Sequence, residues 1–290
     1  MQVIQDFDIL IVQETHFNIL VRCPTGFLFI TRSTPIKSKI PRGGVAVYKN
    51  ERSDFHLDVI CDELRDCVIV KVRDSDLVIA APYITPSNSL YYDEIYFKNL
   101  EMIYQKFNSC DLIITGDMNS RIGTMKYEQL LIEHKENPDS VINANGKKMI
   151  ELIERWKNMV VLNGLVYSDK TFDSKFTCFK GVRCSQNDLS LSNNVDIIEE
   201  YKILPKYVYS DHCPVALTCY VQKLPSLDLV YKCSKDLLCY DHLDVNKRIL
   251  SPIKLCRLDV RRTVKMLDER AMDIQNRLHR EHIDNDNMSL

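Results

Sequence analysis

The sequence predicts an α+β fold in which β-sheets and a small number of helices are packed in layers. Short apolar or alternating runs rich in β-branched residues dominate the first two-thirds of the 290 residues, which is typical of strands. Two other segments repeat apolar residues at helical spacing. Strands separated by helices at this chain length favour a layered α+β or α/β sandwich.

The expected strands are mostly apolar at successive positions, which indicates burial on both faces. The first expected helix carries apolar residues from Ile95 to Phe107, and the second carries them from Met149 to Trp156 after a cap at Asn145. The strands are predicted at residues 8–12, 44–48, 67–72, 77–81, 112–115, 160–162, 188–192 and 214–221.

The character of the chain changes at about residue 224. From there the sequence is rich in charge, and residues 243–283 place apolar side chains among charges without strand alternation, a pattern that favours helices. We therefore expect one domain over residues 1–222 and a helical C-terminal extension over residues 223–290. The final residues, 284–290, are expected to be frayed or disordered.

Composition limits the class of protein. A formal net charge of -2 argues against a uniformly basic nucleic-acid binder, although local basic patches can still hold phosphates. The eleven cysteines are scattered without a C-x-x-C pair, so we expect reduced thiols. There is no signal-peptide pattern and no apolar stretch of membrane-spanning length. These features predict a nuclear or cytoplasmic protein that is not secreted.

Three polar clusters at strand ends carry the candidate chemistry. The central one is Gly116-Asp117-Met118-Asn119, which follows an apolar strand. Polar groups at the end of a buried strand are a common way to build a phosphate-processing site. The other clusters are Gln13-Glu14-Thr15-His16 after the first strand and Ser210-Asp211-His212 before the last.

These residue types suit metal-assisted cleavage of a phosphodiester. Glu14 offers a hard oxygen ligand to Mg²⁺, which takes one or two protein carboxylates and keeps most of its waters. Asp117 can orient or deprotonate the attacking water, and Asn119 can donate to a phosphate oxygen. His212 would contact the scissile phosphate, with Asp188 as the carboxylate that orients its ring and raises its pKa.

Together these motifs resemble the endonuclease/exonuclease/phosphatase superfamily. The order of the motifs is most similar to the apurinic-endonuclease-like domain that non-LTR retrotransposons encode beside a reverse transcriptase. The resemblance covers about residues 6–221. It rests on Asp8-Ile9-Leu10-Ile11-Val12-Gln13-Glu14-Thr15-His16, Gly43-Gly44-Val45-Ala46-Val47, Ala81-Pro82-Tyr83-Ile84-Thr85-Pro86, Gly116-Asp117-Met118-Asn119-Ser120-Arg121, Asn145-Gly146, Leu162-Asn163-Gly164, Ser185-Gln186-Asn187-Asp188 and Ser210-Asp211-His212.

The resemblance implies a deoxyribonuclease-I-like, four-layer sandwich of two packed β-sheets flanked by helices, with the site where the loops gather at one end. It implies that Glu14 binds the metal, that Tyr83 contacts the phosphate, and that Asp211 lies near the metal or the leaving oxygen. The implied cofactor is Mg²⁺, or Mn²⁺ in its place, and the implied partners are DNA and a reverse transcriptase domain of the parent element. The remaining implied site residues are Asp117, Asn119, and Asp188 paired with His212.

One feature of the family pattern is absent from the sequence. Family members begin with a strand that ends in an Asn, ahead of the helix that leads to the Gln-Glu-Thr-His motif. Here Met1 lies only a few residues before the strand that ends near Glu14, so we expect this first strand and its Asn to be missing. A missing strand would leave unpaired backbone groups in the sheet.

Two groups of basic residues are candidate substrate contacts. One group precedes Gly43, and the other is interleaved with aromatic residues before Asp188, a pattern that suits a phosphate backbone together with a base or wedge contact. The alternative is a pair of solvated basic loops. The residues are Arg32, Lys37, Lys39 and Arg42 in the first group, and Lys170, Lys175, Lys180 and Arg183 among Phe172, Phe176 and Phe179 in the second.

Three functions fit the sequence. The first is a Mg²⁺-dependent endonuclease domain that nicks one DNA strand. The second is a phosphatase that acts on a small phosphoester or a phospholipid head group. The third is an inactive, truncated relic with residual DNA binding, and its main support is the missing first strand.

Overall fold

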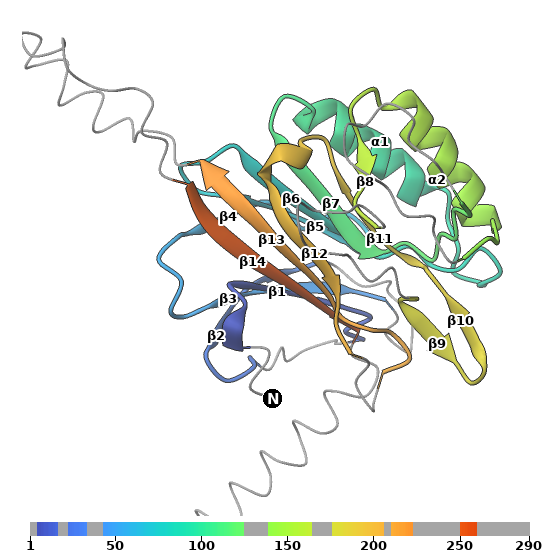
Figure 1. The fold of residues 1–290 in the computed structure, drawn as a ribbon, viewed down its shortest axis with the longest axis horizontal. Coiled ribbons are helices and arrows are strands. Elements are labelled where there is room, and N and C mark those ends of the chain that lie inside the picture. The colour runs from blue at the N-terminus through green and yellow to red at the C-terminus, as the bar shows by residue number, and fades with distance from the viewer. Residues whose placement is uncertain are drawn as a thin grey trace, which may run out of the picture.

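The computed structural model describes residues 5–16, 23–33, 43–124, 139–163, 176–205, 210–222 and 250–259. Two six-stranded mixed β-sheets pack face to face, and helices α1 and α2 cover the outer face of one of them (Figure 1). The predicted α+β sandwich is therefore confirmed. In the described part of the chain the flanking helices lie on one sheet, so the structure there has three of the four expected layers.

The strands of the first sheet lie in the order β12-β13-β14-β1-β3-β2, and those of the second in the order β4-β5-β6-β7-β11-β8. Strands β9 and β10 form a separate hairpin that projects beyond the sheets (Figure 1). The bounds are β1 Ile9–Gln13, β2 Phe27–Arg32, β3 Val45–Asn50, β4 Leu57–Cys61, β5 Cys67–Val72, β6 Leu77–Pro82, α1 Ile95–Phe107, β7 Asp111–Asp117, α2 Ala144–Arg155, β8 Val160–Val161, β9 Cys178–Lys180, β10 Arg183–Ser185, β11 Asp188–Ser192, η2 Val195–Ile197, β12 Ile198–Ile203, β13 Val215–Gln222 and β14 Leu250–Asp259.

Two apolar cores hold the layers together. One lies between the sheets, where Ile11 and Leu217 of the first sheet meet Ile79 of the second, all at most 2% exposed. The other lies between the second sheet and the helices, with Leu100 of α1 and Met149 of α2 as central members. Because β5, β6 and β7 contribute to both cores, their sequences are apolar on both faces, as predicted.

The eight strands and two helices predicted within residues 1–222 are all present, with small shifts at their ends. The second helix is capped by Asn143, whose side chain accepts from the backbone N–H of Gly146 (2.7 Å); the prediction of Asn145 as the cap is wrong by two residues. The described cysteines are free thiols, as expected: Cys23, Cys61, Cys67, Cys110, Cys178, Cys184, Cys213 and Cys219.

The main correction concerns the C-terminal segment. Residues 250–259 form strand β14, so the prediction of helix is wrong for these residues; the rest of the proposed extension lies outside the described residues. Strand β14 pairs in parallel with β1 and antiparallel with β13. It therefore belongs to the sheet of the main domain, and the expected gap beside β1 is absent because β14 occupies that position.

The pairing of β14 explains how a strand with a proline enters the middle of a sheet. Pro252 lies opposite Tyr220 of β13, whereas pairing with β1 begins only at Leu255. At Pro252 the strand has one neighbour among the described strands, and proline is tolerated where the ladder continues on one side only. The sequence did not predict β14 because the charged residues around this segment leave no alternation of apolar and polar residues, the pattern that predicts a strand.

Candidate functional site

The predicted motifs gather at one end of the sandwich. Strand β1 ends at Gln13, β7 ends at Asp117, and β11 begins at Asp188. In the antiparallel pair of β7 and β11, Asp117 and Asp188 are register partners. His212 lies three residues before β13 begins, and it forms a bridge pair with Cys178 of the β9–β10 hairpin.

The centre of the site is a buried histidine between two carboxylates. Nδ1 of His212 lies 3.1 and 3.0 Å from the two carboxylate oxygens of Asp188, and its Nε2 lies 4.0 Å from Oδ2 of Asp117. Burial opposes the charged imidazole, but the carboxylates of Asp188 and Asp117 outweigh it and hold the pKa of His212 well above 6.5. At neutral pH, His212 therefore carries a positive charge and two N–H donors.

Gln13 connects this centre to the opposite sheet. Its Oε1 accepts from the backbone N–H of Asp117 (2.6 Å), and its Nε2 donates to the carbonyl oxygen of Pro82 (2.5 Å). The side chain is 1% exposed. By bridging β1, β6 and β7, the Gln13 side chain fixes the position of Asp117 relative to Glu14. Sequence analysis placed Gln13 in a motif without giving it this role.

Glu14 lies beside Tyr83 at the edge of the same site. The Tyr83 hydroxyl donates to Oε1 of Glu14, and Nε2 of His16 lies 3.8 Å from Oε2. Because a phenol has one hydrogen to donate, contact with a phosphate would require Tyr83 to exchange this bond. Glu14 and His16 both have φ of 51°, a left-handed conformation that is uncommon for these residues and recurs at functional sites.

Asn119 is also in the left-handed region, with φ of 45°. Its backbone N–H donates to Oδ1 of Asp117 (3.0 Å), and its Nδ2 donates to the carbonyl oxygen of Ile84 (2.9 Å). The amide group has two hydrogens, and one of them is used by Ile84. The arrangement ties Asn119 to Asp117 as a compact unit at the end of β7.

Gly116 is required because no side chain fits beside Asp117. A Cβ at this position would lie 1.9 Å from the carbonyl oxygen of Pro82 and 2.8 Å from Nε2 of Gln13. We expect Gly116→Ala to lower the free energy of unfolding by about 3 kcal/mol because β6 and β7 must separate. Urea unfolding measures this change.

The matched control is Gly181→Ala in the turn of the β9–β10 hairpin. Gly181 has φ of +62° with nothing within 4 Å of a built Cβ, so this change imposes only the conformational cost, about 1 kcal/mol. Equal losses in the two variants would show that the crowding at Gly116 has no effect.

Of the predicted basic substrate contacts, Lys180 and Arg183 lie on the β9–β10 hairpin. On the hairpin, Nζ of Lys180 lies 3.8 Å from Oδ2 of Asp211, and Arg183 is exposed. Lys175 lies outside the described residues, as do Lys37, Lys39, Arg42, Lys170 and Phe172. Phe176 and Phe179 pack edge to face with ring centroids 6.4 Å apart. Lys180 therefore lies beside Asp211, and Arg183 is opposite Lys180 in the hairpin.

Asp66 is a buried carboxylate that the sequence analysis missed. It is 0% exposed, and it accepts hydrogen bonds from the backbone N–H of Gly44 (2.7 Å) and the hydroxyl of Tyr96 (3.0 Å). Burial raises the pKa of its carboxyl group. Gly44 in turn accepts from the backbone N–H of Thr15 (3.3 Å), so Asp66 supports the loop beside Glu14. An isolated Asp before a strand gave no signal for this role.

Asp139 is a second missed carboxylate, and it braces two site loops. Its oxygens accept from Nε (2.7 Å) and Nη2 (2.5 Å) of Arg121 and from the backbone N–H of Gln186 (2.9 Å). Burial favours the neutral acid, but the hydrogen bonds from Arg121, Gln186 and Val141 outweigh it and hold the pKa of Asp139 below its ordinary value. Asp139 thereby joins the segment after Asn119 to the segment before Asp188.

This contact predicts a pH-dependent loss of stability. Since the folded pKa of Asp139 is depressed, its stabilisation is present above the unfolded pKa of about 3.9 and is lost as the pH falls through the folded value. We expect Asp139→Asn to cost about 3 kcal/mol at pH 7, because the Arg121 guanidinium loses its partner. The difference from the native protein should narrow below pH of about 4, as measured by urea unfolding across pH.

Asp58→Asn is the matched control for Asp139. Asp58 makes a comparable two-pronged contact with Arg73, but this pair is exposed on the surface, where ion pairs add little stability. A loss at Asp58 as large as that at Asp139 would contradict the bracing role.

Two groups of potential metal ligands occur in the described residues. The first contains Asp117, Asp188 and His212, and the second contains Cys178, Asp211 and His212; the ligand atoms of each group lie within 4.8 Å of one another. Glu14, the predicted metal ligand, is in neither group. Cys178 was expected only as a reduced thiol, and its position next to His212 is the unexpected feature.

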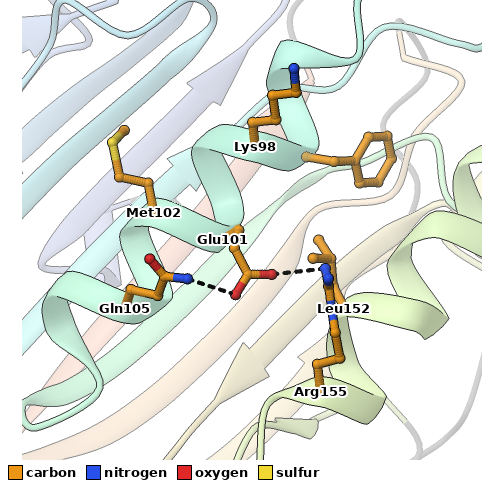
Figure 2. A pocket seen from close by; sticks show the side chains of 7 residues that line it. Lys98, Glu101, Met102, Gln105, Leu152 and Arg155 are labelled. Carbon is orange, nitrogen blue, oxygen red and sulfur yellow. Dashed lines mark hydrogen bonds and ion pairs between the residues drawn. The ribbon is translucent and has the colours of Figure 1, made fainter.

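A pocket between the helices is separate from this site. Figure 2 shows it lined by Phe97, Lys98, Glu101, Met102, Gln105, Leu152 and Arg155. Glu101 accepts from Nη2 of Arg155 (2.9 Å) and from Nε2 of Gln105 (3.2 Å). The first contact joins α1 to α2 and the second lies within α1; none of the lining residues belongs to the strand-end cluster.

No family model and no curated protein matches the sequence. Among solved structures, the chain is similar to an AP endonuclease from Archaeoglobus fulgidus, with 15% identity over 72% of this chain and 87% of that chain and a TM-score of 0.46. It is also similar to the inositol polyphosphate 5-phosphatase domain of SPSynaptojanin, in complex with inositol (1,4)-bisphosphate and calcium ion, with 14% identity over 88% of this chain and 70% of that chain and a TM-score of 0.33.

The class that the fold defines is thus an α+β sandwich with a buried aspartate-histidine cluster at one end of its sheets. None of the helices in the described ranges is long and apolar enough to cross a membrane.

Proposed function

We propose that this protein is a metal-dependent phosphodiesterase, specifically a DNA endonuclease domain that nicks one strand. The observation that carries the proposal is the buried His212, held by Asp188 on one side and facing Asp117 on the other. A cationic histidine beside a carboxylate can stabilise a phosphoryl group while the carboxylate prepares a water. The sequence resemblance to endonucleases of non-LTR retrotransposons supports DNA as the substrate.

The residues present fit a hard divalent cation. Glu14 and Asp211 offer carboxylate oxygens, the ligand type that Mg²⁺ prefers, and Glu14 is 5% exposed. A nearby positive charge favours the ionised form of such a buried carboxylate. We propose that these two residues hold Mg²⁺, or Mn²⁺ in its place. When bound, the cation would neutralise charge that develops on the phosphoryl oxygens.

The protein groups divide the remaining work. Asp117 accepts a proton from the attacking water, and Asn119 donates its remaining Nδ2 hydrogen to a non-bridging oxygen. His212 donates from Nε2 to the phosphate, while Asp188 keeps the ring oriented through Nδ1. The Tyr83 hydroxyl either keeps its hydrogen bond to Glu14 or exchanges it for one to the phosphate. Lys180 and Arg183, together with Lys175, would contact the DNA backbone.

The proposal includes the setting of the domain. We propose a retrotransposon origin, a reverse transcriptase domain in the parent element as partner, and a nuclear or cytoplasmic location. The structure weakens the alternative of an inactive relic, since β14 fills the position beside β1 that was expected to be vacant. A phosphatase would use the same cluster of residues, and only its substrate would distinguish it from an endonuclease.

Conversion of supercoiled plasmid to the relaxed circle tests the proposal. We expect nicking that requires Mg²⁺ or Mn²⁺ and is lost in His212→Gln. Absence of metal-dependent nicking, or nicking that persists in this variant, would contradict it. Release of inorganic phosphate from inositol phosphates at rates far above plasmid nicking would favour the phosphatase instead.

A further inference from the structure

Cys178 lies directly across from His212 on the neighbouring backbone. The backbone N–H of Phe179 donates to the carbonyl oxygen of Asp211, and that of Cys213 donates to the carbonyl oxygen of Thr177, both at 2.7 Å. These two bonds flank the pair of Cys178 and His212, which is itself an antiparallel bridge. The pair is therefore of the non-hydrogen-bonded type, in which facing side chains are closest.

This geometry brings three different ligand atoms together. The Cys178 sulfur, an Asp211 oxygen and a His212 nitrogen lie within 4.8 Å of one another. Cys178 is 2% exposed and His212 is 6% exposed, whereas the Asp211 side chain is 30% exposed and faces Lys180 at 3.8 Å. Two ligands are thus fixed in the interior, and the third opens to solvent, which provides a path for entry of an ion.

The second coordination shell that such a site needs is also present. Asp188 lies 3.0 Å from Nδ1 of His212, which leaves Nε2 as the ligand nitrogen. Histidines that bind metals almost always donate their other N–H to a carboxylate or carbonyl, because this fixes the ring and raises its basicity. The backbone N–H of Asp188 donates to Oγ1 of Thr177 (3.2 Å), so the backbone that carries this carboxylate is tied to the residue directly before Cys178.

We propose that Cys178, Asp211 and His212 form a binding site for a thiophilic divalent cation, with Zn²⁺ as the ion it fits. Thiolate, imidazole and carboxylate are the usual ligands of Zn²⁺, and three protein ligands with a fourth position open to solvent are a common arrangement. Binding releases the thiol proton of Cys178 and the Nε2 proton of His212 to solvent. No electron transfer is involved.

The proposed Zn²⁺ and Mg²⁺ sites share Asp211 as a ligand. Cys178 and His212 are ligands of the first site only, and Glu14 is a ligand of the second only. Occupation by Zn²⁺ would also remove the Nε2 hydrogen that His212 is proposed to donate to the phosphate. The site therefore predicts that Zn²⁺ inhibits nicking in the presence of Mg²⁺. The binding itself does not depend on the proposed function and is measured without it.

Cobalt substitution of the full chain tests the site directly. Co²⁺ reports a thiolate ligand through a sulfur-to-metal charge-transfer band in the near ultraviolet. We expect this band in the native protein, its removal by Zn²⁺, and its absence in Cys178→Ser. Titration of Zn²⁺ against a chromophoric chelator should show a loss of Zn²⁺ affinity of at least about tenfold in Cys178→Ser.

Cys213→Ser is the matched control, since Cys213 is a buried neighbour of His212 that belongs to neither ligand group. It should keep the band. If Cys178→Ser does not fold, as judged by thermal unfolding, Asp211→Asn is used; it should keep the band with weaker Co²⁺ affinity. A native protein without the band, a band that survives in Cys178→Ser, or unchanged affinity in Asp211→Asn would overturn the site.

The nicking assay separates this inference from the proposed function. Native protein that nicks plasmid and shows no cobalt band retains the function and loses the zinc site. Native protein with the band and no nicking retains the site and loses the function. Where both hold, Zn²⁺ should inhibit nicking by the native protein far more than nicking by Cys178→Ser, each rate being compared with that of the same protein with Mg²⁺ alone.

Discussion

Leu255→Pro is expected to destabilise the protein severely, by about 3 kcal/mol or more. At Leu255 the backbone of β14 pairs with Ile9 of β1 on one side and with Leu217 of β13 on the other. A proline removes a ladder hydrogen bond at the centre of the sheet, where the missing N–H cannot be satisfied by water. Thermal and urea unfolding followed by circular dichroism measure the change.

The chain supplies its own comparison for this experiment. Pro252 is present naturally in the part of β14 that, among the described strands, pairs with β13 alone, so a proline in this segment is tolerated where the described ladder continues on one side only. Leu255→Val keeps the N–H and the strand preference and should cost far less. If Leu255→Pro unfolds at the same temperature as the native protein, β14 does not contribute a central strand in solution.

Asp117→Asn is expected to reduce the rate of plasmid nicking by at least about 100-fold, the usual contribution of a general base. The amide keeps the size of the side chain, and its oxygen can still accept from the backbone N–H of Asn119. It cannot accept a proton from water at neutral pH. The fold should therefore persist while the chemistry is lost, as checked by nicking rates beside thermal unfolding.

Asp111→Asn is the matched control because Asp111 lies at the opposite end of the same strand, where its carboxylate accepts from Nδ2 of Asn194 (2.8 Å). It should nick at the native rate. Equal rates for Asp117→Asn and the native protein would remove Asp117 from the proposed mechanism, and a similar fall in both variants would point to a general effect on β7.

Much of the site was predictable because its residues are contiguous with strong strand signals. Asp117 follows the apolar run of residues 112–114 and Thr115-Gly116, and Asp188 opens an alternating strand, so period and polarity alone place them at strand ends. The pairing of these two ends could not be read from the strands. It depends on β11 lying antiparallel beside β7 in the register that sets Asp188 opposite Asp117.

The residues that sequence analysis missed act through distant contacts. Asp139 lies 18 positions from Arg121 and 47 from Gln186, and Gln13 lies 104 positions from Asp117. Nothing local distinguishes such a carboxylate or amide from a solvated loop residue. Its role appears only when folding buries it and requires that each polar group find a partner.

The sequence by itself determined the α+β layering, the two helices and the strand-end positions of Glu14, Asp117, Asp188 and His212, since these follow from periods of two and 3.6 residues and from local polarity. The tertiary structure decided where the C-terminal segment goes and what lies opposite His212. The segment of residues 250–259 forms a central strand because the backbone groups of both β1 and β13 require hydrogen-bond partners. Cys178 came to face His212 through strand pairing, which depends on contacts between distant parts of the chain.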